Sequence, residues 1–209
     1  NIAMRHRALA HGYSMSEWGL KPLDDKKSAP VAKSEDDVFK AVGLPWIPPE
    51  IREGAGEIEA AEAGQLPQLV ELKDIQGVFH NHTTASDGDN SVAQMAAEVE
   101  RRGWKYIGIS DHSKSSFQAR GLDEARLLAQ VDEIKKLNES AKFKVRILSG
   151  SEVDILRDGT MDFSDEILGK LDFVVGAVHN LFTLDEEAQT KRIIKAIENE
   201  HVDMIAHLT

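Results

Sequence analysis

The sequence predicts an α/β fold in which parallel strands carry histidines and acids at one rim. Five short apolar segments alternate with helical patterns, and this alternation is typical of a parallel sheet. Each segment ends in, or is followed by, a histidine or an acid. We expect an incomplete barrel, because the chain stops just after the last of these segments, which are residues 77–79, 106–112, 145–152, 173–179 and 202–207.

The polar residues at these ends predict a shared site. Parallel strands bring their carboxyl ends to one rim, where β/α barrel enzymes carry out their chemistry. His80 and His82 are two residues apart and would point to one face of a strand, and Asp87 follows on a turn. An isolated His-x-His motif is as often a solvent-exposed strand end as half of a metal site. The prediction of a site therefore depends on the repeated occurrence of histidines and acids at the segment ends. Five of the eight histidines fall at segment ends: His80, His82, His112, His179 and His207.

The N-terminal part lacks this alternation and is predicted to be a small α-rich unit. It is expected to contain, in order, a helix over 1–12, a short turn or strand over 14–20, an exposed connection over 21–33, a helix over 36–42 that Ser34 caps, an extended segment over 44–51 and a short helix over 57–63. Trp18 and Trp46 are expected to pack rather than to stack on bases, because large aromatic side chains are usually buried.

Four helices are expected in the second part, which begins within residues 66–74. The division that follows is residues 1–66 and residues 67–209. The last helix is expected to bury an edge formed by Ile193, Ile194 and Ile197. The four helices are predicted over residues 90–102, 122–137, 164–168 and 185–198.

Composition narrows the class of protein. The chain has 36 acidic and 25 basic residues, and a formal net charge of -11 argues against a protein that coats nucleic acid through a basic surface. A nucleic-acid substrate stays open, because bound cations invert the local field of an acidic site. The chain has no cysteine, so any metal must be held by nitrogen and oxygen. We expect no membrane span, a cytoplasmic location and, since the chain starts at Asn1, a fragment of a longer protein.

The predicted cluster of imidazoles and carboxylates suits phosphoester hydrolysis. Divalent ions held by such ligands lower the pKa of bound water, neutralise phosphate oxygens and stabilise a leaving alkoxide. Asp111 faces away from His112 along its strand and is assigned a catalytic role in orienting a ligand, with a structural role as the alternative. Lys114 and Arg120 are candidates for binding substrate phosphates, with solvated loop charges as the alternative. The other histidines are not expected to be ligands: His6, His11 and His201.

Several motifs point to a family. The order of the site residues resembles that of the PHP family, named for polymerase and histidinol phosphatase. The motifs that carry the closer resemblance are HTTASDG at 82–88, SDHS at 110–113, RGLDEARLL at 120–128, GSEVDILRDG at 150–159 and IENEHVDM at 197–204. These motifs are most similar in sequence to the PHP domain fused to bacterial family X DNA polymerases. The motifs NIAMR at 1–5, GYSMSEWGL at 12–20 and LPWIPPEIR at 44–52 are similar to the end of the thumb in those polymerases. The resemblance covers nearly the whole chain.

The resemblance implies a distorted seven-stranded β/α barrel, here incomplete, with up to three divalent cations at its rim. Manganese or zinc is expected, with iron as an alternative. Glu152 would bridge two ions and is therefore assigned a catalytic role. A last pair of ligands, Asp-x-His, would lie beyond Thr209, so we expect weak or no hydrolysis from this chain alone. The implied metal ligands are His80, His82, Asp87, His112, Glu152, His179 and His207.

The implied activity is 3′ to 5′ exonuclease or 3′-end processing of DNA during repair, including base excision repair. DNA 3′ ends and gapped substrates would be partners of the full-length protein, which would also polymerise DNA. One alternative is a small-molecule phosphoesterase of the histidinol phosphatase kind, against which the thumb-like leader counts. Another is a non-catalytic module that stabilises a polymerase, which would require lost ligands. The oligomeric state is left open by the sequence.

Overall fold

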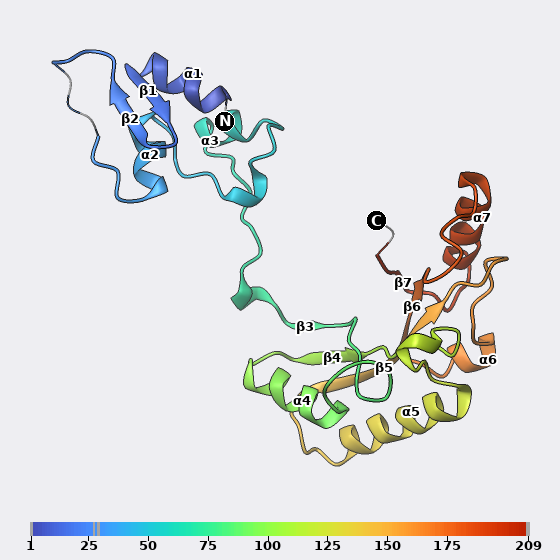
Figure 1. The fold of residues 1–209 in the computed structure, drawn as a ribbon. Helices are drawn as coiled ribbons and strands as arrows, with labels where there is room; N and C mark the ends of the chain where they lie inside the picture. The colour runs from blue at the N-terminus through green and yellow to red at the C-terminus, as the bar shows by residue number, and fades with distance from the viewer. Residues whose placement is uncertain (1, 27, 29, 208–209) are drawn as a thin grey trace. The chain divides into compact units, whose positions relative to one another are not determined.

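The computed structural model describes residues 2–26, 28 and 30–207 (Figure 1). The chain divides into two compact units, Asn1–Val70 and Glu71–Thr209. Each unit has a hydrophobic core of its own. Among the helices that the structure describes, none combines the length and the apolarity that crossing a bilayer requires.

The first unit combines helices with a β-hairpin. Its elements are α1 (Ile2–Ala10), β1 (Tyr13–Ser16), β2 (Gly19–Pro22), α2 (Glu35–Ala41), the 3₁₀ helix η1 (Pro49–Ile51) and α3 (Glu57–Glu62). The three predicted helices are present, and the capping box of Ser34 starts α2. β2 pairs antiparallel with β1 and continues to Pro22, whereas the exposed connection is predicted to start at residue 21. Residues 1, 27 and 29 of the predicted helix and connection lie outside the described part.

The prediction that both tryptophans pack is wrong for Trp18 and only partly right for Trp46. Trp18 sits on the turn between β1 and β2 and is 89% exposed, because a two-residue hairpin turn directs its side chain to solvent. Trp46 is 41% exposed, and its indole Nε1 donates a hydrogen bond to Glu35 Oε2 at 3.1 Å. The neighbouring Ile47 is buried. The segment predicted as extended closes with the 3₁₀ turn η1, since Pro49 suits a first helical position.

The second unit is a curled parallel sheet with helices between successive strands. Its strands are β3 (Gly77–Val78), β4 (Tyr106–Ile109), β5 (Arg146–Asp154), β6 (Phe173–Ala177) and β7 (Met204–Ile205), and they pair in that order. Its helices are η2 (Leu72–Asp74), α4 (Val92–Arg101), η3 (Phe117–Ala119), α5 (Glu124–Glu139), α6 (Asp165–Leu168) and α7 (Glu186–Ile197). Figure 1 shows the sheet bending into an incomplete barrel, as the sequence predicts.

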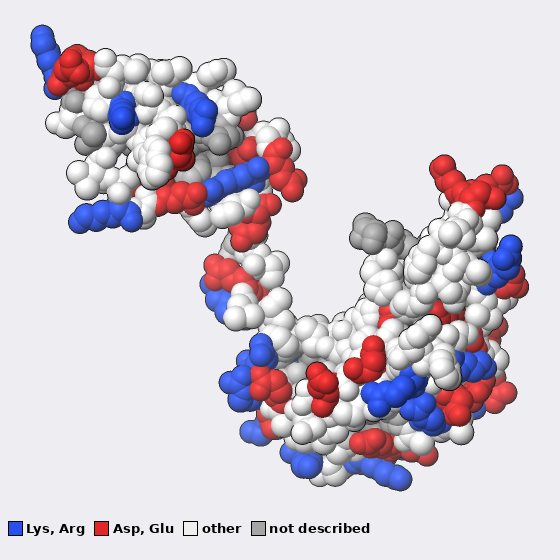
Figure 2. Space-filling model, in the orientation of Figure 1, with Lys and Arg blue, Asp and Glu red and all other residues white. Residues whose placement is uncertain are grey.

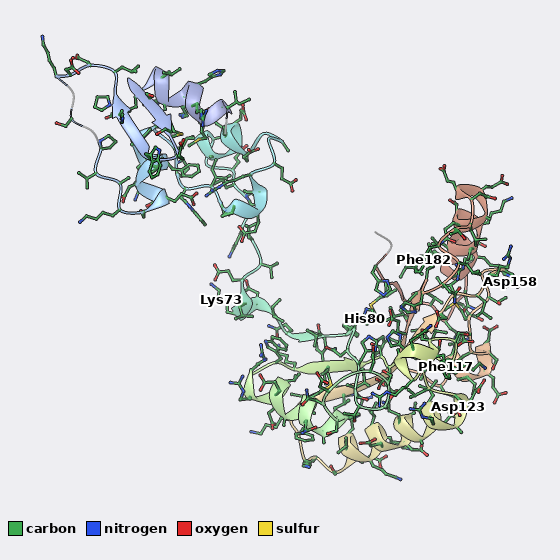
Figure 3. The ribbon with its side chains drawn as sticks, in the orientation of Figure 1. Lys73, His80, Phe117, Asp123, Asp158 and Phe182 are labelled. Carbon is green, nitrogen blue, oxygen red and sulfur yellow. The ribbon has the colours of Figure 1, made fainter. Side chains whose placement is uncertain are left out.

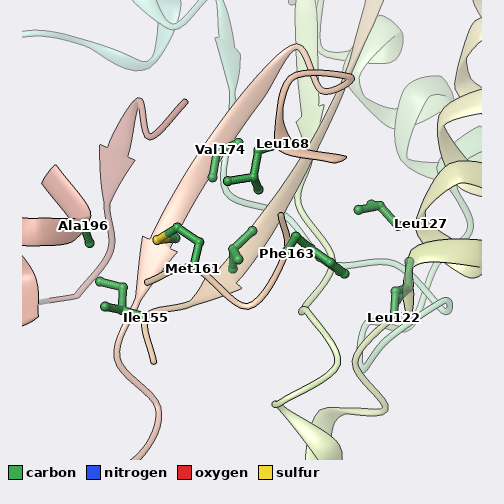
Figure 4. Packing of buried hydrophobic residues seen from close by; sticks show 9 residues of the cluster. Leu122, Leu127, Ile155, Met161, Phe163, Leu168, Val174 and Ala196 are labelled. Carbon is green, nitrogen blue, oxygen red and sulfur yellow. The ribbon is translucent and has the colours of Figure 1, made fainter. Parts of the chain in front are cut away.

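Apolar side chains cover both faces of this sheet. One core joins β5 and β6 to α5, α6 and α7 through residues such as Leu127, Val153 and Leu168 (Figure 4). Inside the curl, the Phe173 ring lies against Gly108 and Gly150, where an added Cβ would come within 2.6 and 2.5 Å of ring atoms. Every residue of β6 is buried, as expected for a parallel strand covered on both faces.

The predicted buried edge of α7 is wrong. Ile194 and Ile197 are exposed, and Ile193 is only partly buried. The side chains that α7 buries are Arg192 and Ala196. The physical reason is that the guanidinium of Arg192 donates hydrogen bonds to backbone carbonyls in the segments that follow β5 and β6, so the helix turns its polar donor inward.

Candidate metal centre

The carboxyl ends of the five parallel strands deliver the predicted site residues to one rim. Glu152 lies near the end of β5 and is 1% exposed. His80 and His82 follow β3, His112 follows β4, and His179 and His207 follow β6 and β7. His80 is labelled at this end of the sheet in Figure 3. Residues up to 127 positions apart in the chain therefore meet because neighbouring strands are in parallel register.

Five imidazoles surround the buried carboxylate of Glu152. Three of them approach one oxygen and two approach the other. Glu152 Oε1 lies 2.7 Å from Nε2 of His207, 3.2 Å from Nε2 of His80 and 3.3 Å from Nε2 of His179. Glu152 Oε2 lies 3.0 Å from Nδ1 of His112 and 3.4 Å from Nε2 of His82.

Asp87 adds a second carboxylate at the edge of the cluster. Its oxygens lie 3.8 Å from His82 Nδ1 and 3.5 Å from His112 Nε2, and the two imidazole rings stack with centroids 4.3 Å apart. The turn that carries Asp87 folds back onto His82, and a Cβ on Gly88 would lie 2.2 Å from the carbonyl oxygen of His82. Gly88 is therefore required for Asp87 to face the histidines.

Within residues 2–26, 28 and 30–207, the donor atoms form three groups, in each of which all the atoms lie within 4.8 Å of one another. The groups are His80 with His82 and Glu152, His82 with Asp87 and His112, and His112 with Glu152 and His179. A neutral imidazole offers one lone pair, so His82 and His112 can each serve only one of their two groups. Glu152 has two oxygens and can serve both of its groups, as a bridging carboxylate does.

Two buried nitrogens indicate that the residues fit a cation. Nδ1 of His82 and Nδ1 of His112 are buried and have no hydrogen-bond partner. His112 Nδ1 is close to Glu152 Oε2, but the two atoms lack the geometry of a hydrogen bond. Buried polar nitrogens without partners destabilise a fold, and a divalent cation at nitrogen and oxygen donors is a partner of the right chemistry.

The electrostatics of the cluster keep Glu152 ionised. Burial raises the pKa of Glu152, but the hydrogen bond from His179 and the charges of His80 and His112 outweigh burial and hold this pKa below its ordinary range. Hydrogen bonds to Asp154 and Glu152 raise the pKa of His179 to about 9. Burial, followed by the charge of His112, lowers the pKa of His82. A carboxylate at the centre of several imidazoles thus stays available as a ligand.

Asp111 stands behind the cluster rather than in it. Its buried carboxylate accepts hydrogen bonds from Thr83 N at 2.7 Å, Thr83 Oγ1 at 2.6 Å, Ser86 Oγ at 2.5 Å and Gln130 Nε2 at 2.6 Å. These donors belong to the turn between His82 and Asp87 and to α5. Asp111 therefore holds the turn that presents two site residues.

The two predicted phosphate-binding residues lie in the loop after β4 and have different surroundings. Lys114 Nζ is 2.5 Å from Glu124 Oε1 and also lies over the Phe163 ring. Arg120 is exposed and adopts a left-handed backbone conformation at the end of η3. His201 lies beside Gly169 and belongs to none of the three groups found in the described residues.

Sequence reasoning missed Asp154 and Ser116. Asp154 Oδ1 is 3.2 Å from His179 Nδ1, and Asp154 Oδ2 accepts a hydrogen bond of 2.6 Å from Ser116 Oγ. A carboxylate that contacts the second nitrogen of a candidate ligand fixes the orientation of its ring. The signal was present for Asp154, because it lies two residues after Glu152 on the same strand and so points to the same face.

Comparison with known proteins agrees with this geometry. Residues 79–209 match the PHP domain family, and residues 1–53 match the DNA polymerase beta thumb family. The whole chain is 41% identical to the DNA polymerase/3′-5′ exonuclease PolX of Bacillus subtilis (strain 168), of which it covers 36%. The chain is also similar to probable phosphatases of Thermoanaerobacter sp. (strain X514) and Acetivibrio thermocellus, each 33% identical over 61% of this chain and about half of the relative.

These matches and the residues at the rim lead to one assignment. The PHP match covers more than half of the chain and includes every candidate ligand. The thumb match covers most of the first unit. The chain belongs to the PHP domain family, with a segment of the DNA polymerase beta thumb family preceding the PHP domain.

Proposed function

We propose that the chain is part of a DNA polymerase and that its residues 67–209 hydrolyse the terminal phosphodiester bond at DNA 3′ ends. The observation that carries this proposal is the buried Glu152 carboxylate surrounded by five imidazoles, two of which have an unpartnered buried nitrogen. The polymerase thumb in the same chain, which we assign to residues 1–66 with the linker, favours DNA as the substrate.

The proposed ligands are His80, His82, Asp87, His112, Glu152, His179 and His207. Glu152 would help to hold two cations, because each of its oxygens faces a different set of imidazoles. These residues would hold up to three cations, and manganese or zinc suits a donor set of imidazole and carboxylate without thiolate, with iron as an alternative. When bound, the cations supply Lewis acidity and an activated water.

The chain's own residues hold the reacting groups in place. Asp111 keeps the 83–86 turn in position, and Asp154 orients the ring of His179. Arg120 and Lys114 bind substrate phosphate oxygens, with Arg120 the better placed because Lys114 pairs with Glu124. Water attacks the terminal phosphorus, the bond from phosphorus to the preceding 3′ oxygen breaks, and that oxygen takes up a proton. The products are a nucleoside monophosphate and a shortened 3′-hydroxyl end, which suits DNA repair in the cytoplasm.

A second candidate function is hydrolysis of small phosphate esters. The similarity of the PHP part to probable phosphatases favours it. The two candidates differ in substrate, since a phosphatase of this kind would hydrolyse histidinol phosphate and leave DNA 3′ ends intact. The thumb segment is unexplained by the phosphatase alternative.

A nuclease assay on the full-length protein tests the proposal. The variants are His82→Ala and Glu152→Ala, and DNA polymerisation by the same preparations is the internal control. We expect hydrolysis of 3′ ends in Mn²⁺ to fall at least about 100-fold, because a lost ligand removes the cation that activates water. Metal content, measured on the same samples, falls with it.

The matched control is Glu166→Gln, since Glu166 is an exposed acid of α6 that pairs with Lys170. This variant keeps both activities. Parallel loss of polymerisation and hydrolysis in Glu152→Ala would point to misfolding. Wild-type protein with less than one ion per chain and no hydrolysis would support a non-catalytic module instead.

A further inference from the structure

Two phenylalanines are exposed in the loops that leave the candidate metal centre. Phe117 is 85% exposed and Phe182 is 73% exposed, and they are the most exposed aromatic side chains in the described part of the second unit. Both are labelled at the carboxyl end of the sheet in Figure 3, as is His80. A single exposed apolar residue is ordinary, but two exposed rings in loops that leave one site are available to a ligand bound there.

Buried contacts with the site hold Phe117 in place. It follows Ser116, whose hydroxyl lies 3.2 Å from His179 Nδ1 and 2.6 Å from Asp154 Oδ2. The Ser116 carbonyl also accepts hydrogen bonds from the backbone of Ala119 and Gly121, at 3.1 and 3.0 Å. The loop is therefore a fixed turn tied to a candidate ligand, and it still leaves the phenyl ring in solvent.

Phe182 is held in a similar way in the loop that follows β6. It lies three residues after His179, and the intervening Asn180 accepts hydrogen bonds from the buried Arg192, at 2.9 Å to its backbone oxygen and 3.0 Å to Oδ1. Leu181 then adopts a left-handed conformation with φ of 57°, which costs a non-glycine residue free energy. The chain thus turns sharply beside the site and exposes the ring.

The charge of the surface favours aromatic stacking as a source of affinity for DNA beside the phosphate contacts. Figure 2 shows Lys and Arg interspersed with Asp and Glu on the face it draws, without a continuous basic stripe among the side chains described there. The chain carries a net charge of -11. Stacking of bases on aromatic rings depends little on net charge, so it can add affinity to the few phosphate contacts that Arg120 and Lys114 offer.

We propose that Phe117 and Phe182 stack on unpaired nucleobases at a DNA 3′ end and so direct its terminal phosphodiester to the metal ligands. This inference rests on the proposed function and narrows the substrate to single-stranded or frayed 3′ ends. A paired base is already stacked within its duplex, so the rings select for ends that have opened.

The test measures binding of the full-length protein in EDTA, so that hydrolysis does not interfere. The probe is a single-stranded oligonucleotide with 2-aminopurine at its 3′ terminus, followed by fluorescence quenching. Phe117→Leu and Phe182→Leu keep apolar bulk but remove the ring, whereas Phe117→Tyr and Phe182→Tyr keep it. We expect each Leu variant to raise Kd about 5-fold or more, and each Tyr variant to stay within about 2-fold of wild type.

A second oligonucleotide carries an abasic 3′ terminus and competes for the same site. The Leu variants should bind it as wild type does, because no terminal base remains to stack. Ile197→Ala is the control for loss of an exposed apolar side chain, since Ile197 is 55% exposed on α7, and it should change neither Kd. Unchanged quenching in the Leu variants, or equal weakening for the normal and abasic ends, would overturn the inference.

Hydrolysis of bis(p-nitrophenyl) phosphate in Mn²⁺ separates this inference from the proposed function. That ester has no nucleobase, so the Leu variants should hydrolyse it at the wild-type rate. If the wild type hydrolyses neither the ester nor DNA, the proposed function fails, and the quenching experiment still decides whether the two rings bind the 3′ end.

Discussion

Single buried polar residues determine how the rim is organised. Asp111 and Asp154 are fully buried, yet neither belongs to the three groups of candidate ligand atoms among the described residues. Each instead accepts hydrogen bonds from residues that carry or contact a ligand. Carboxylates of this kind cost free energy to bury and are retained only when several donors satisfy them. Their substitution should therefore affect stability before it affects chemistry.

Replacing Asp111 by asparagine tests this at the scale of one residue. Burial raises the pKa of Asp111, but hydrogen bonds from Ser86, Thr83 and Gln130 outweigh burial and lower it. The side chain is thus a carboxylate that only accepts, and an amide would set its NH₂ group against donors. We expect Asp111→Asn to lower the free energy of unfolding by about 3 kcal/mol. Urea denaturation in EDTA measures this change.

Asp132→Asn is the matched control, because Asp132 is an exposed acid on the same helix as Gln130. Its effect should stay within about 0.5 kcal/mol. Equal stability of wild type and Asp111→Asn would mean that the 83–86 turn does not depend on this carboxylate.

At the scale of elements, Arg192 adds buried hydrogen bonds to the apolar packing that attaches α7 to the sheet. The Arg192 guanidinium donates to the carbonyls of Ile155, Leu156 and Asn180, and so joins α7 to the end of β5 and to the loop after His179. Burial lowers the pKa of Arg192 and the charge of Asp154 acts in the opposite direction. Sequence periodicity predicts that the isoleucines of α7 face the sheet, but the buried charge of Arg192 determines which face of the helix does so.

Removing this guanidinium should loosen α7. We expect Arg192→Met to destabilise the second unit by about 3 kcal/mol, because three carbonyl oxygens lose a charged donor. Arg192→Lys should recover only part of this loss, since an ammonium group lacks the planar array of five N–H donors. Thermal unfolding and amide exchange of α7 measure both effects. Lys191→Met changes a neighbouring exposed cation and should leave both unchanged; a comparable loss there would contradict the assignment.

In the first unit, Glu35 joins α2 to the segment that carries Trp46. Arg52 donates two hydrogen bonds to Glu35, of 2.6 and 2.8 Å, and Trp46 donates one. The hydrogen bonds from Arg52, followed by the one from Trp46, lower the pKa of Glu35 from 4.5 to about 2. Because the folded pKa is below the unfolded value, this network stabilises the unit fully above about pH 4.5, and the stabilisation is lost as the pH falls towards 2.

NMR titration of the Glu35 carboxyl group checks this prediction directly. We expect a midpoint near pH 2 in the wild type and a midpoint near 4.5 in Arg52→Gln, which removes the main donor. Glu35→Gln should flatten the pH dependence of the first unit's stability within this window. An ordinary carboxyl titration in the wild type would show that the exposed ion pair is too well solvated to matter.

At the scale of the whole molecule, the proposed cations should stabilise the second unit and leave the stability of the first unit unchanged. The first unit has its own core around Phe39, Val42 and Ile47, whereas the candidate ligands all lie in the second. An ion that binds only the folded site adds about 2.7 kcal/mol when its concentration is 100 times Kd. Chelation should therefore lower the melting temperature of the second unit alone.

Differential scanning calorimetry of the full-length protein, with Mn²⁺ or with EDTA, measures this effect. His82→Ala, which lacks a proposed ligand, should respond less to the metal. A shift of equal size in both units, or none in either, would contradict a metal centre confined to the rim.

The sequence by itself determined the alternation of strands and helices, the order of the rim residues and the family. These features are local: periodicity and motif spacing are set within a few residues, and the strand ends near His112, Glu152 and His179 follow from them. It also predicts that Asp111 faces away from His112, since alternation along a strand is fixed by backbone geometry.

Only the tertiary structure decided that five imidazoles converge on one buried carboxylate, that Asp154 orients His179, and that α7 buries Arg192. The tertiary structure also decided that Trp18, Phe117 and Phe182 are exposed. The physical reason is that burial depends on which distant segments pack against a side chain. Residue type and spacing record what a side chain is able to do, whereas long-range packing decides which groups it meets.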